Sequence, residues 1–186
     1  MLGNTFGGTA HAGPLDEPGS ALKPAKRLIL EPRSVPLPPP GKLIFPVEIP
    51  PKSNIYVLDN FGDCRSHEGI DILAANGGNP VFAVADGQLT KRYTNTGTAG
   101  WGWTLYVAAT KVTYKYFHLT EDPYGLREGS LVKRGDVLGF VGSSGTNSVT
   151  NFHLHFEVRP NNVPVNPLPL IDIPADILIG PPQPSC

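Results

Sequence analysis

The distribution of proline limits most strongly what this chain can fold into. Of its 21 prolines, 11 lie within residues 1–51, two within 52–159 and eight from residue 160 onward. Proline lacks the backbone N–H that a β-ladder requires and disrupts helix interiors, so proline-dense segments occupy turns, sheet edges or extended chain. We therefore predict a proline-rich N-terminal extension or linker over residues 1–51, a folded domain over 52–168 and a C-terminal tail over 169–186.

Short runs rich in β-branched and aromatic residues recur between the proline-rich segments, and such runs are typical of strands. The clearest are NIYVLDNFG, PVFAVADG, GQLTKRYTN, WTLYVAAT, VTYKYFHLT, DVLGFVG and HLHFEVR. Apolar residues show no helical spacing, and Asp86-Gly87 is typical of a hairpin turn between two of the runs. The pattern predicts an all-β domain, antiparallel, folded as a sandwich or an open barrel.

Composition argues against several classes of protein. The chain has 15 basic and 16 acidic residues and no run of like charge, so we expect no nucleic-acid partner. No segment is apolar over the length that a transmembrane helix needs, so we expect no integral membrane segment. The first part of the chain also lacks the apolar block of a signal peptide. The two cysteines, Cys64 and Cys186, fit either a disulfide of an exported protein or two thiols in the cytosol.

The stretch NFHLHFEVRP, residues 151–160, contains two histidines one residue apart. Side chains at positions i and i+2 point apart on a helix but share one face of a strand, so we interpret this stretch as a strand. Its polar face then carries His153, His155, Glu157 and Arg159. Its apolar face carries Leu154, Phe156 and Val158, which we expect to contact the core.

A second polar cluster lies in SHEGIDIL, residues 66–73. His67 and Asp71 are four residues apart, and Gly69 with the neighbouring isoleucines favours a strand over a helix. We therefore expect His67, Gly69 and Asp71 on one strand face, where the glycine leaves room for an ion between the two polar side chains.

A sheet can bring the polar faces of these two segments together. It would then gather four side chains of the kinds that bind zinc: His67, Asp71, His153 and His155. Catalytic zinc sites use three protein ligands and keep one position open, so one of these four is spare. A histidine held beside the metal without binding it is suited to act as an acid or a base.

A third element lies in TYKYFHLT, residues 113–120. Strand alternation places Tyr114, Tyr116 and His118 on one face. A lone histidine at a strand end is more often solvated than functional, so His118 gains its interest from the other two clusters.

The motifs HEGID, YFHL and HLHFEVRP, in this order, resemble those of the lysostaphin and LytM-type zinc metalloendopeptidases, also called the β-lytic family. PVFAVADGQL after the first motif and LVKRGDVLGFVGSSGT before the last extend the resemblance over roughly residues 58–168. It implies the LytM peptidase fold and one Zn²⁺ per chain. The implied zinc ligands are His67, Asp71 and His155, and the implied catalytic pair without a bond to the metal is His118 and His153.

The resemblance further implies a zinc-dependent endopeptidase that hydrolyses peptide bonds in bacterial peptidoglycan, within stem cross-links or glycine bridges. Its partner would be the peptidoglycan peptide, and its location would be secreted, periplasmic or cell-wall associated, with an export signal outside this chain. In the implied mechanism His153 takes a proton from the attacking water and His118 stabilises the oxyanion, although the two roles are open to exchange.

Other readings of the same residues remain open. Cys64 lies three residues before His67, so Cys64, His67, His153 and His155 could form a closed structural zinc site, which would leave Asp71 and His118 unexplained. A non-enzymatic peptidoglycan-binding or hydrolase-activating scaffold would share the fold. A phosphocarrier domain with a phosphorylated histidine is a further alternative, but it would not need Asp71 beside His67.

Two smaller features complete the expectations. Trp101 and Trp103 belong either to the core or to the wall of a substrate cleft. GSSGT, residues 142–146, does not fit the G-x-S-x-G pattern of a serine nucleophile and is interpreted as a turn.

Overall fold

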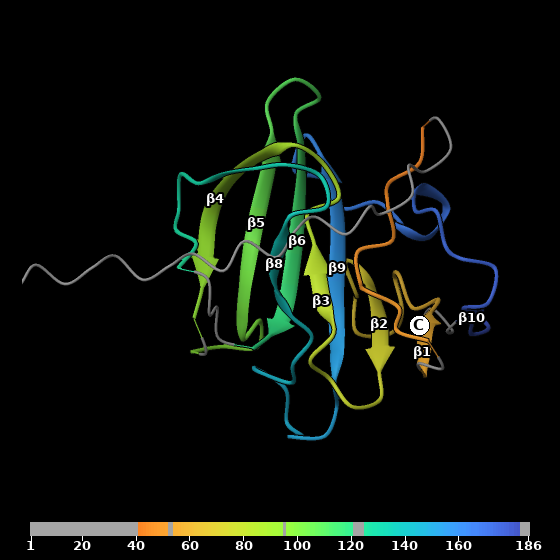
Figure 1. Ribbon diagram of the computed structural model, residues 1–186. Coiled ribbons are helices and arrows are strands. Elements are labelled where there is room, and N and C mark those ends of the chain that lie inside the picture. Colours follow the sequence, from red (N-terminus) through yellow and green to blue (C-terminus); the bar gives the residue numbers. More distant parts are fainter. Residues whose placement is uncertain (1–40, 52–53, 95, 121–124, 183–186) are drawn as a thin grey trace, which may run out of the picture.

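The computed structural model describes residues 41–51, 54–94, 96–120 and 125–182 (Figure 1). Their regular elements are β1 (Ile55–Leu58), β2 (Ile70–Ala74), β3 (Pro80–Phe82), β4 (Gly87–Tyr93), β5 (Trp101–Val107), β6 (Val112–Leu119), β7 (Leu131–Val132), β8 (Val137–Phe140), β9 (His153–Pro160), the 3₁₀ turn η1 (Leu168–Leu170) and β10 (Leu178–Ile179). These residues form no α-helix, and thus none that is long and apolar enough to cross a membrane. The expected all-β class is confirmed.

Eight of the strands form one large sheet in the order β10-β1-β2-β9-β6-β5-β4-β7. Neighbouring strands are antiparallel except for the parallel pair β1 and β10. β3 and β8 form a separate two-stranded sheet, which lies over the large sheet in Figure 1. The large sheet ends at β10 and β7 and does not close on itself, so the fold is an open sandwich.

The prediction of a hairpin turn at Asp86-Gly87 is wrong. β3 pairs with β8, whereas β4 pairs with β5 and β7, so this dipeptide connects strands of different sheets. The Asp86 carboxylate instead accepts hydrogen bonds from the Arg134 backbone N–H at 2.8 Å and from Lys133 Nζ at 2.9 Å. This aspartate therefore holds the turn between β7 and β8.

The hydrophobic core lies between the two sheets. Tyr116 of β6 and Phe156 of β9 are fully buried, as are Val81 of β3 and Leu138 of β8. The buried Tyr116 hydroxyl accepts a hydrogen bond from the Val84 backbone N–H at 3.1 Å, which ties the small sheet to the large one. The apolar side chains of β9 thus contact the core, as the alternation of its sequence predicts.

Parts of both terminal segments pack against this core. Ile44, Phe45 and Val47 are buried, and Leu43 forms a parallel bridge with Ile171. The C-terminal segment supplies β10, which pairs with β1 at the sheet edge. Residues 1–40, most of the predicted extension, lie outside the described residues, so the division of the chain at residues 51 and 168 stays a prediction.

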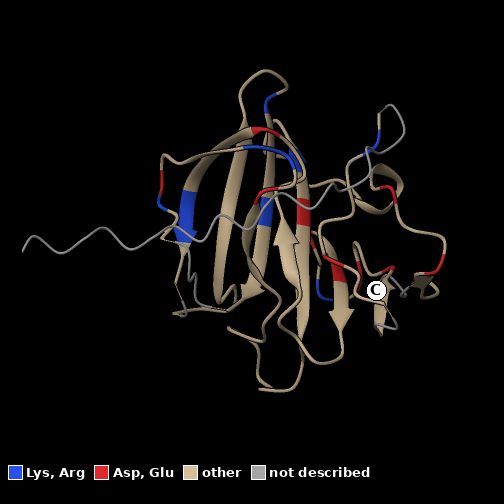
Figure 2. Ribbon diagram, viewed as in Figure 1, with Lys and Arg blue, Asp and Glu red and all other residues tan. Residues whose placement is uncertain are grey.

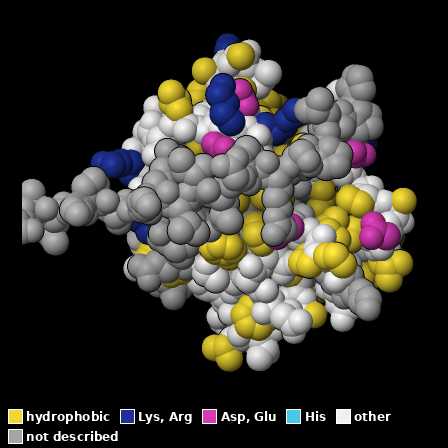
Figure 3. Space-filling view, viewed as in Figure 1, with side chains coloured by type: hydrophobic (Ala, Val, Ile, Leu, Met, Phe, Trp, Pro, Cys, Tyr) yellow, Lys and Arg dark blue, Asp and Glu magenta, His cyan; other side chains and the backbone are white. Residues whose placement is uncertain are grey.

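Charged side chains of both signs are distributed over the fold. Figure 2 shows Lys and Arg interspersed with Asp and Glu along the sheet and its loops. On the face drawn in Figure 3, charged side chains of both signs show among hydrophobic ones, and neither sign forms a continuous patch in the part that is coloured. The distribution agrees with the balanced composition of the sequence.

Gly69 lies where the chain entering β2 touches β9. A Cβ atom at Gly69 would come within 2.4 Å of the Phe156 carbonyl oxygen and 2.9 Å of His155 Nε2. The expectation that this glycine leaves room for an ion is therefore wrong. Its missing side chain instead allows β9, which carries His155, to approach the backbone.

We predict that Gly69→Ala destabilises the metal-free protein by about 1–3 kcal/mol, because the added methyl overlaps a backbone carbonyl that cannot move freely. Denaturant unfolding measures this change. Gly97→Ala is the matched control, since no described atom lies within 4 Å of the Cβ position there. Equal stability of the two variants would contradict the close approach.

Candidate metal centre

Strand pairing brings the first two ligand candidates together. β2 and β9 are antiparallel neighbours, and Asp71 is the direct cross-strand partner of His155. Directly opposed residues project to the same face of a sheet, so the carboxylate and the imidazole meet. The Asp71 Oδ1 atom lies 3.2 Å from His155 Nδ1.

His67 reaches the same point from a loop. The prediction that a strand carries His67 is wrong, because β2 begins at Ile70 and Ser66 has a φ of 55°. A turn holds this segment, in which the Gly62 N–H donates to the His67 carbonyl at 2.8 Å. His67 Nε2 nevertheless lies 3.1 Å from Asp71 Oδ1, so the two residues meet as expected.

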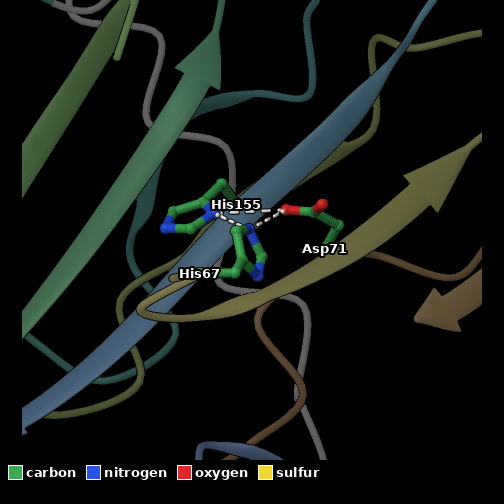
Figure 4. Close-up of side chains that lie close together, drawn as sticks. All are labelled: His67, Asp71 and His155. Atoms are coloured by element: carbon green, nitrogen blue, oxygen red, sulfur yellow. Dashed lines mark hydrogen bonds and ion pairs between the residues drawn. The ribbon is translucent and has the colours of Figure 1, made fainter. Parts of the chain in front are cut away.

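Three potential ligand atoms converge: His67 Nε2, Asp71 Oδ1 and His155 Nδ1 (Figure 4). The separation of the two nitrogens is 2.8 Å, and the distances from each nitrogen to the oxygen are 3.1 and 3.2 Å. A tetrahedral zinc with bonds of about 2.0–2.2 Å would separate its ligands by about 3.3–3.6 Å, so a small outward adjustment would admit the ion. The donor set and its geometry therefore fit zinc.

Asn60, which sequence reasoning missed, supports two of these residues. Its Nδ2 donates to Asp71 Oδ2 at 2.8 Å, and its Oδ1 accepts from the Asp71 backbone N–H at 3.2 Å. The Asn60 carbonyl oxygen lies 3.1 Å from His67 Nδ1 and can only accept, so His67 donates there and turns Nε2 toward Asp71. Asn60 has an exposed fraction of only 1%, which is unusual for asparagine and marks it as part of the site.

Charge in the cluster follows from these contacts. Burial alone would raise the pKa of Asp71, but hydrogen bonds from His155 and His67 hold it far below its usual range. Burial alone would lower the pKa of His155, but Asp71 and Glu157 together raise it. The carboxylate of Asp71 is thus ionised at neutral pH, as a metal ligand must be.

His153 lies beside the cluster without belonging to it. Its Nε2 is 3.9 Å from Asp71 Oδ1, beyond the contacts that join the three converging atoms. Its Nδ1 lies 2.9 Å from the Asn151 carbonyl oxygen and must donate there, so Nε2 is the unprotonated nitrogen of the neutral ring.

A β-bulge brings His118 to the same face of the sheet. Trp101 pairs with Leu119 and Trp103 with Tyr116, so two residues of β6 oppose Gly102 alone. His118 has a φ of 62°, and its ring centroid lies 4.4 Å from that of His153. The expected common face for Tyr114, Tyr116 and His118 is therefore wrong, because the bulge interrupts the alternation after the buried Tyr116.

The GSSGT turn orients the His118 ring. His118 Nδ1 donates to the Ser144 carbonyl at 2.8 Å, while Ser144 Oγ accepts from the Trp101 N–H at 2.9 Å. Burial, followed by the neighbouring His153, lowers the pKa of His118 to about 4. His118 is therefore neutral at physiological pH, with its unprotonated Nε2 directed away from the turn.

A hollow of about 340 Å³ opens over this face, and its lining includes Asp71, His118 and His153. Arg65 stands at its rim, with its guanidinium 3.9 Å from Asp71 Oδ2. A second hollow of about 580 Å³ adjoins it and is lined in part by Trp101. Trp103 is 2% exposed and belongs to the core, so the two tryptophans have different surroundings.

Cys64 does not extend the cluster. It is engaged in a disulfide, and Cys186, the other cysteine of the sequence, lies outside the described residues. A thiolate is the form of cysteine that binds zinc, so an oxidised Cys64 does not fit the closed structural site.

Comparison with known proteins agrees with this geometry. The family model for Peptidase family M23 matches residues 65–167, more than half of the chain. The DD-carboxypeptidase/endopeptidase Mpg of Neisseria meningitidis serogroup B is 42% identical over 105 residues, which are 56% of this chain and 22% of Mpg. The murein hydrolase activator NlpD of Salmonella dublin is 34% identical over 113 residues, which are 60% of this chain and 28% of NlpD. The match thus spans about a quarter of the length of these relatives.

The solved structures include a putative glycyl-glycine endopeptidase LytM from Ruminococcus gnavus. It superposes with a TM-score of 0.54 and 28% sequence identity, over 70% of this chain and 59% of that chain. The family match, the shared sheet and the motifs that form the cluster all agree with the resemblance found in the sequence. This chain belongs to peptidase family M23.

Proposed function

We propose that the chain is a zinc-dependent endopeptidase that hydrolyses peptide bonds in bacterial peptidoglycan. The observation that carries this proposal is the arrangement of five side chains on one sheet face. Three converge through the atoms that zinc prefers, and two imidazoles stand beside them without joining the cluster. A catalytic zinc site needs this combination of three ligands and neighbouring acid–base groups.

His67, Asp71 and His155 would hold one Zn²⁺ per chain. When bound, the ion would lower the pKa of a water molecule to about 7 and polarise the scissile carbonyl. Asn60 and Glu157 contact the other nitrogens of the two histidines, so Nε2 of His67 and Nδ1 of His155 are the nitrogens that would bind the ion.

His153 is the proposed general base. Its Nδ1 proton is held by the Asn151 carbonyl, so Nε2 is free to accept the proton of the attacking water and then deliver it to the leaving amine. The 3.9 Å distance from Nε2 to the ligand atom of Asp71 would place it next to that water.

His118 is the proposed stabiliser of the oxyanion. Its ring is packed against His153 and held by Ser144, so its Nε2 has a fixed position on the hollow. A neutral His118 with its proton on Nδ1 must gain a second proton before Nε2 can donate. We therefore propose that His118 takes this second proton from solvent as the oxyanion develops and returns it to solvent when the intermediate collapses, while the proton of the attacking water passes through His153 to the leaving amine.

The proposed substrate is a peptidoglycan peptide lying along the two adjoining hollows. Polar side chains in both linings, among them Thr146, which is common to both, offer hydrogen-bond partners to a peptide backbone. Peptidoglycan is outside the cytoplasmic membrane, so this function would place the protein in a secreted, periplasmic or cell-wall-associated location.

A second candidate is a non-enzymatic activator of other murein hydrolases. The similarity to the murein hydrolase activator NlpD favours it. An activator would bind peptidoglycan or a partner enzyme but would not require the three converging ligand atoms or the two imidazoles beside them. Their presence supports the enzyme as the first candidate.

We predict one tightly bound zinc per chain and its loss in His67→Ala and Asp71→Ala, since each variant removes one of three ligands. Elemental analysis of the purified proteins measures zinc content. A His67→Ala or Asp71→Ala protein with wild-type zinc content would overturn the proposed ligand set.

We predict that Cys64→Ser keeps the zinc content of the wild type, because the oxidised sulfur offers no thiolate. The same elemental analysis applies. Loss of zinc in this variant would instead support the closed structural site.

We predict that His153→Ala retains zinc and loses hydrolysis by a factor of about 10²–10⁴, the usual contribution of general acid–base catalysis. Release of fragments from purified sacculi of known cross-link chemistry, identified by mass, gives the rate and the bond that is cut. His155→Ala is the comparison, because it should lose both zinc and hydrolysis. Near-normal turnover of His153→Ala would remove the general base from the mechanism, and a zinc-loaded wild type that releases nothing would favour the activator.

A further inference from the structure

Arg65 is a charged side chain of the cleft to which the proposed mechanism gives no role. Among the described residues, it is the only Lys or Arg that lines either hollow, and Asp71, a proposed metal ligand, is the only Asp or Glu. The second hollow has no charged side chain in its lining, which includes the aromatic rings of Trp101 and Phe152. The cleft therefore has a cationic end at Arg65 and an uncharged end beyond the imidazoles.

Asp63 holds the Arg65 side chain in place. Nε and Nη2 of Arg65 donate to Asp63 Oδ2 at 3.0 and 2.6 Å, and the Arg65 backbone N–H donates to Asp63 Oδ1 at 2.9 Å. The Asp63 side chain is 10% exposed, whereas that of Arg65 is 64% exposed. A guanidinium has five N–H donors, and these contacts use those of one edge. Arg65 is thus restrained before any ligand arrives, while Nη1, which no described residue contacts, keeps its donors for a ligand.

The place of Arg65 relative to the ligand cluster identifies the part of a substrate that it would meet. Its Nη2 lies 3.9 Å from Asp71 Oδ2, while the other oxygen of this carboxylate, Oδ1, is the proposed ligand atom. His153, which would deliver a proton to the leaving amine, lines the same hollow as Arg65, and no histidine lines the second hollow. The leaving amine and the guanidinium therefore belong to the same side of the cleft.

We propose that Arg65 is a specificity-determining residue that binds a carboxylate on the carbon attached to the scissile nitrogen. Such a carboxylate carbon is about 3–4 Å from the attacked carbonyl carbon, which keeps it beside the ligand cluster. Guanidinium and carboxylate form planar, charge-assisted pairs. This inference rests on the proposed function and names the class of bond that it would act on.

Peptidoglycan contains bonds with and without this carboxylate. A stem cross-link through the amine of diaminopimelate has a carboxylate on the carbon that bears the amine, and so does a stem that ends in D-Ala-D-Ala. The interior bonds of a glycine bridge have none. Recognition by Arg65 therefore favours stem cross-links over glycine bridges as the bonds that the protein would hydrolyse.

The experiment compares the wild type with Arg65→Gln and Arg134→Gln. The substrates are cross-linked muropeptide dimers whose diaminopimelate carboxylate is either free or amidated, and kcat/KM is measured for each. Arg134 is the matched control because it is exposed and lines neither hollow. The zinc content of each protein is measured alongside.

We expect the wild type to prefer the free carboxylate by about 10-fold in kcat/KM. This is the lower end of the usual contribution of a hydrogen bond to a charged group, because Arg65 is largely exposed. Arg65→Gln should lose the preference through a slower reaction of the free-carboxylate dimer, and Arg134→Gln should keep it. Equal losses of Arg65→Gln on both dimers would mean that Arg65 only supports the turn, and would overturn the inference. Cleavage of a pentaglycine peptide by the wild type at the rate of the free dimer would overturn it as well.

Binding separates this inference from the proposed function. His153→Ala, which we expect to retain zinc with little turnover, is titrated calorimetrically with both dimers, alone and combined with Arg65→Gln. Preference for the free carboxylate that disappears with Arg65 supports the inference even if the wild type hydrolyses neither dimer, in which case only the proposed enzyme fails. Equal affinity for both dimers overturns it even in an active enzyme.

A second pair of ligands distinguishes the two sources of the carboxylate. Stem peptides that end in D-Ala-D-Ala, with the terminal carboxylate free or amidated, are titrated in the same way. A preference that depends on Arg65 in this pair alone would support the same contact with a stem end, and a preference in the dimers would support it at a cross-link. Absence of the preference from both pairs would overturn the inference.

Discussion

Each imidazole of the site donates from one ring nitrogen to a fixed acceptor, and the chemistry available at the other nitrogen depends on that bond. The acceptors are the carbonyls of Asn60, Ser144 and Asn151 and the carboxylate of Glu157. Neutral imidazole has one donor and one acceptor nitrogen, so each bond selects which nitrogen keeps a lone pair. In the proposed mechanism, this selection leaves Nε2 of His67 and Nδ1 of His155 to bind the cation and Nε2 of His153 to accept a proton. Without these acceptors, convergence of the rings alone would not define a metal site.

The fold brings these groups together by combining a regular sheet with local backbone irregularities. Antiparallel pairing places Asp71 opposite His155, and the approach permitted by Gly69 brings β9 against the segment that carries His67. The bulge at His118 requires a glycine opposite it, because a Cβ at Gly102 would lie 2.2 Å from the Tyr116 carbonyl oxygen. A positive φ in a histidine is uncommon and costs conformational energy, which the contacts of His118 with Ala99 and Ser144 offset. Regular strand pairing thus sets the distance between Asp71 and His155, and the local irregularities orient the side chains of His67 and His118.

Sequence patterns predicted the regular part of this arrangement. The period of two in HLHFEVR gave the strand and its two faces, and the spacing of His67 and Asp71 indicated that they act together. The loop position of His67 and the bulge at His118 could not be predicted, because both depend on which distant strand each segment pairs with. Asn60 lies in a polar loop with no periodic pattern, and its contact with Asp71 appears only after the chain folds. Glu157 was placed on the correct face, but its ion pair with Lys115 could not be predicted, because a neighbouring strand contributes Lys115.

The matched region covers about a quarter of the length of the curated relatives. The similarity to them therefore concerns the domain that contains the site and not the whole of those proteins. A crystal structure of the zinc-loaded protein, with anomalous diffraction recorded at the zinc edge, tests the proposed ligand set. We expect one anomalous peak bonded to His67 Nε2, Asp71 Oδ1 and His155 Nδ1, with no other protein atom in its coordination sphere. A peak bonded to His153 or His118, a fourth protein ligand, or zinc bound only elsewhere on the chain would contradict it.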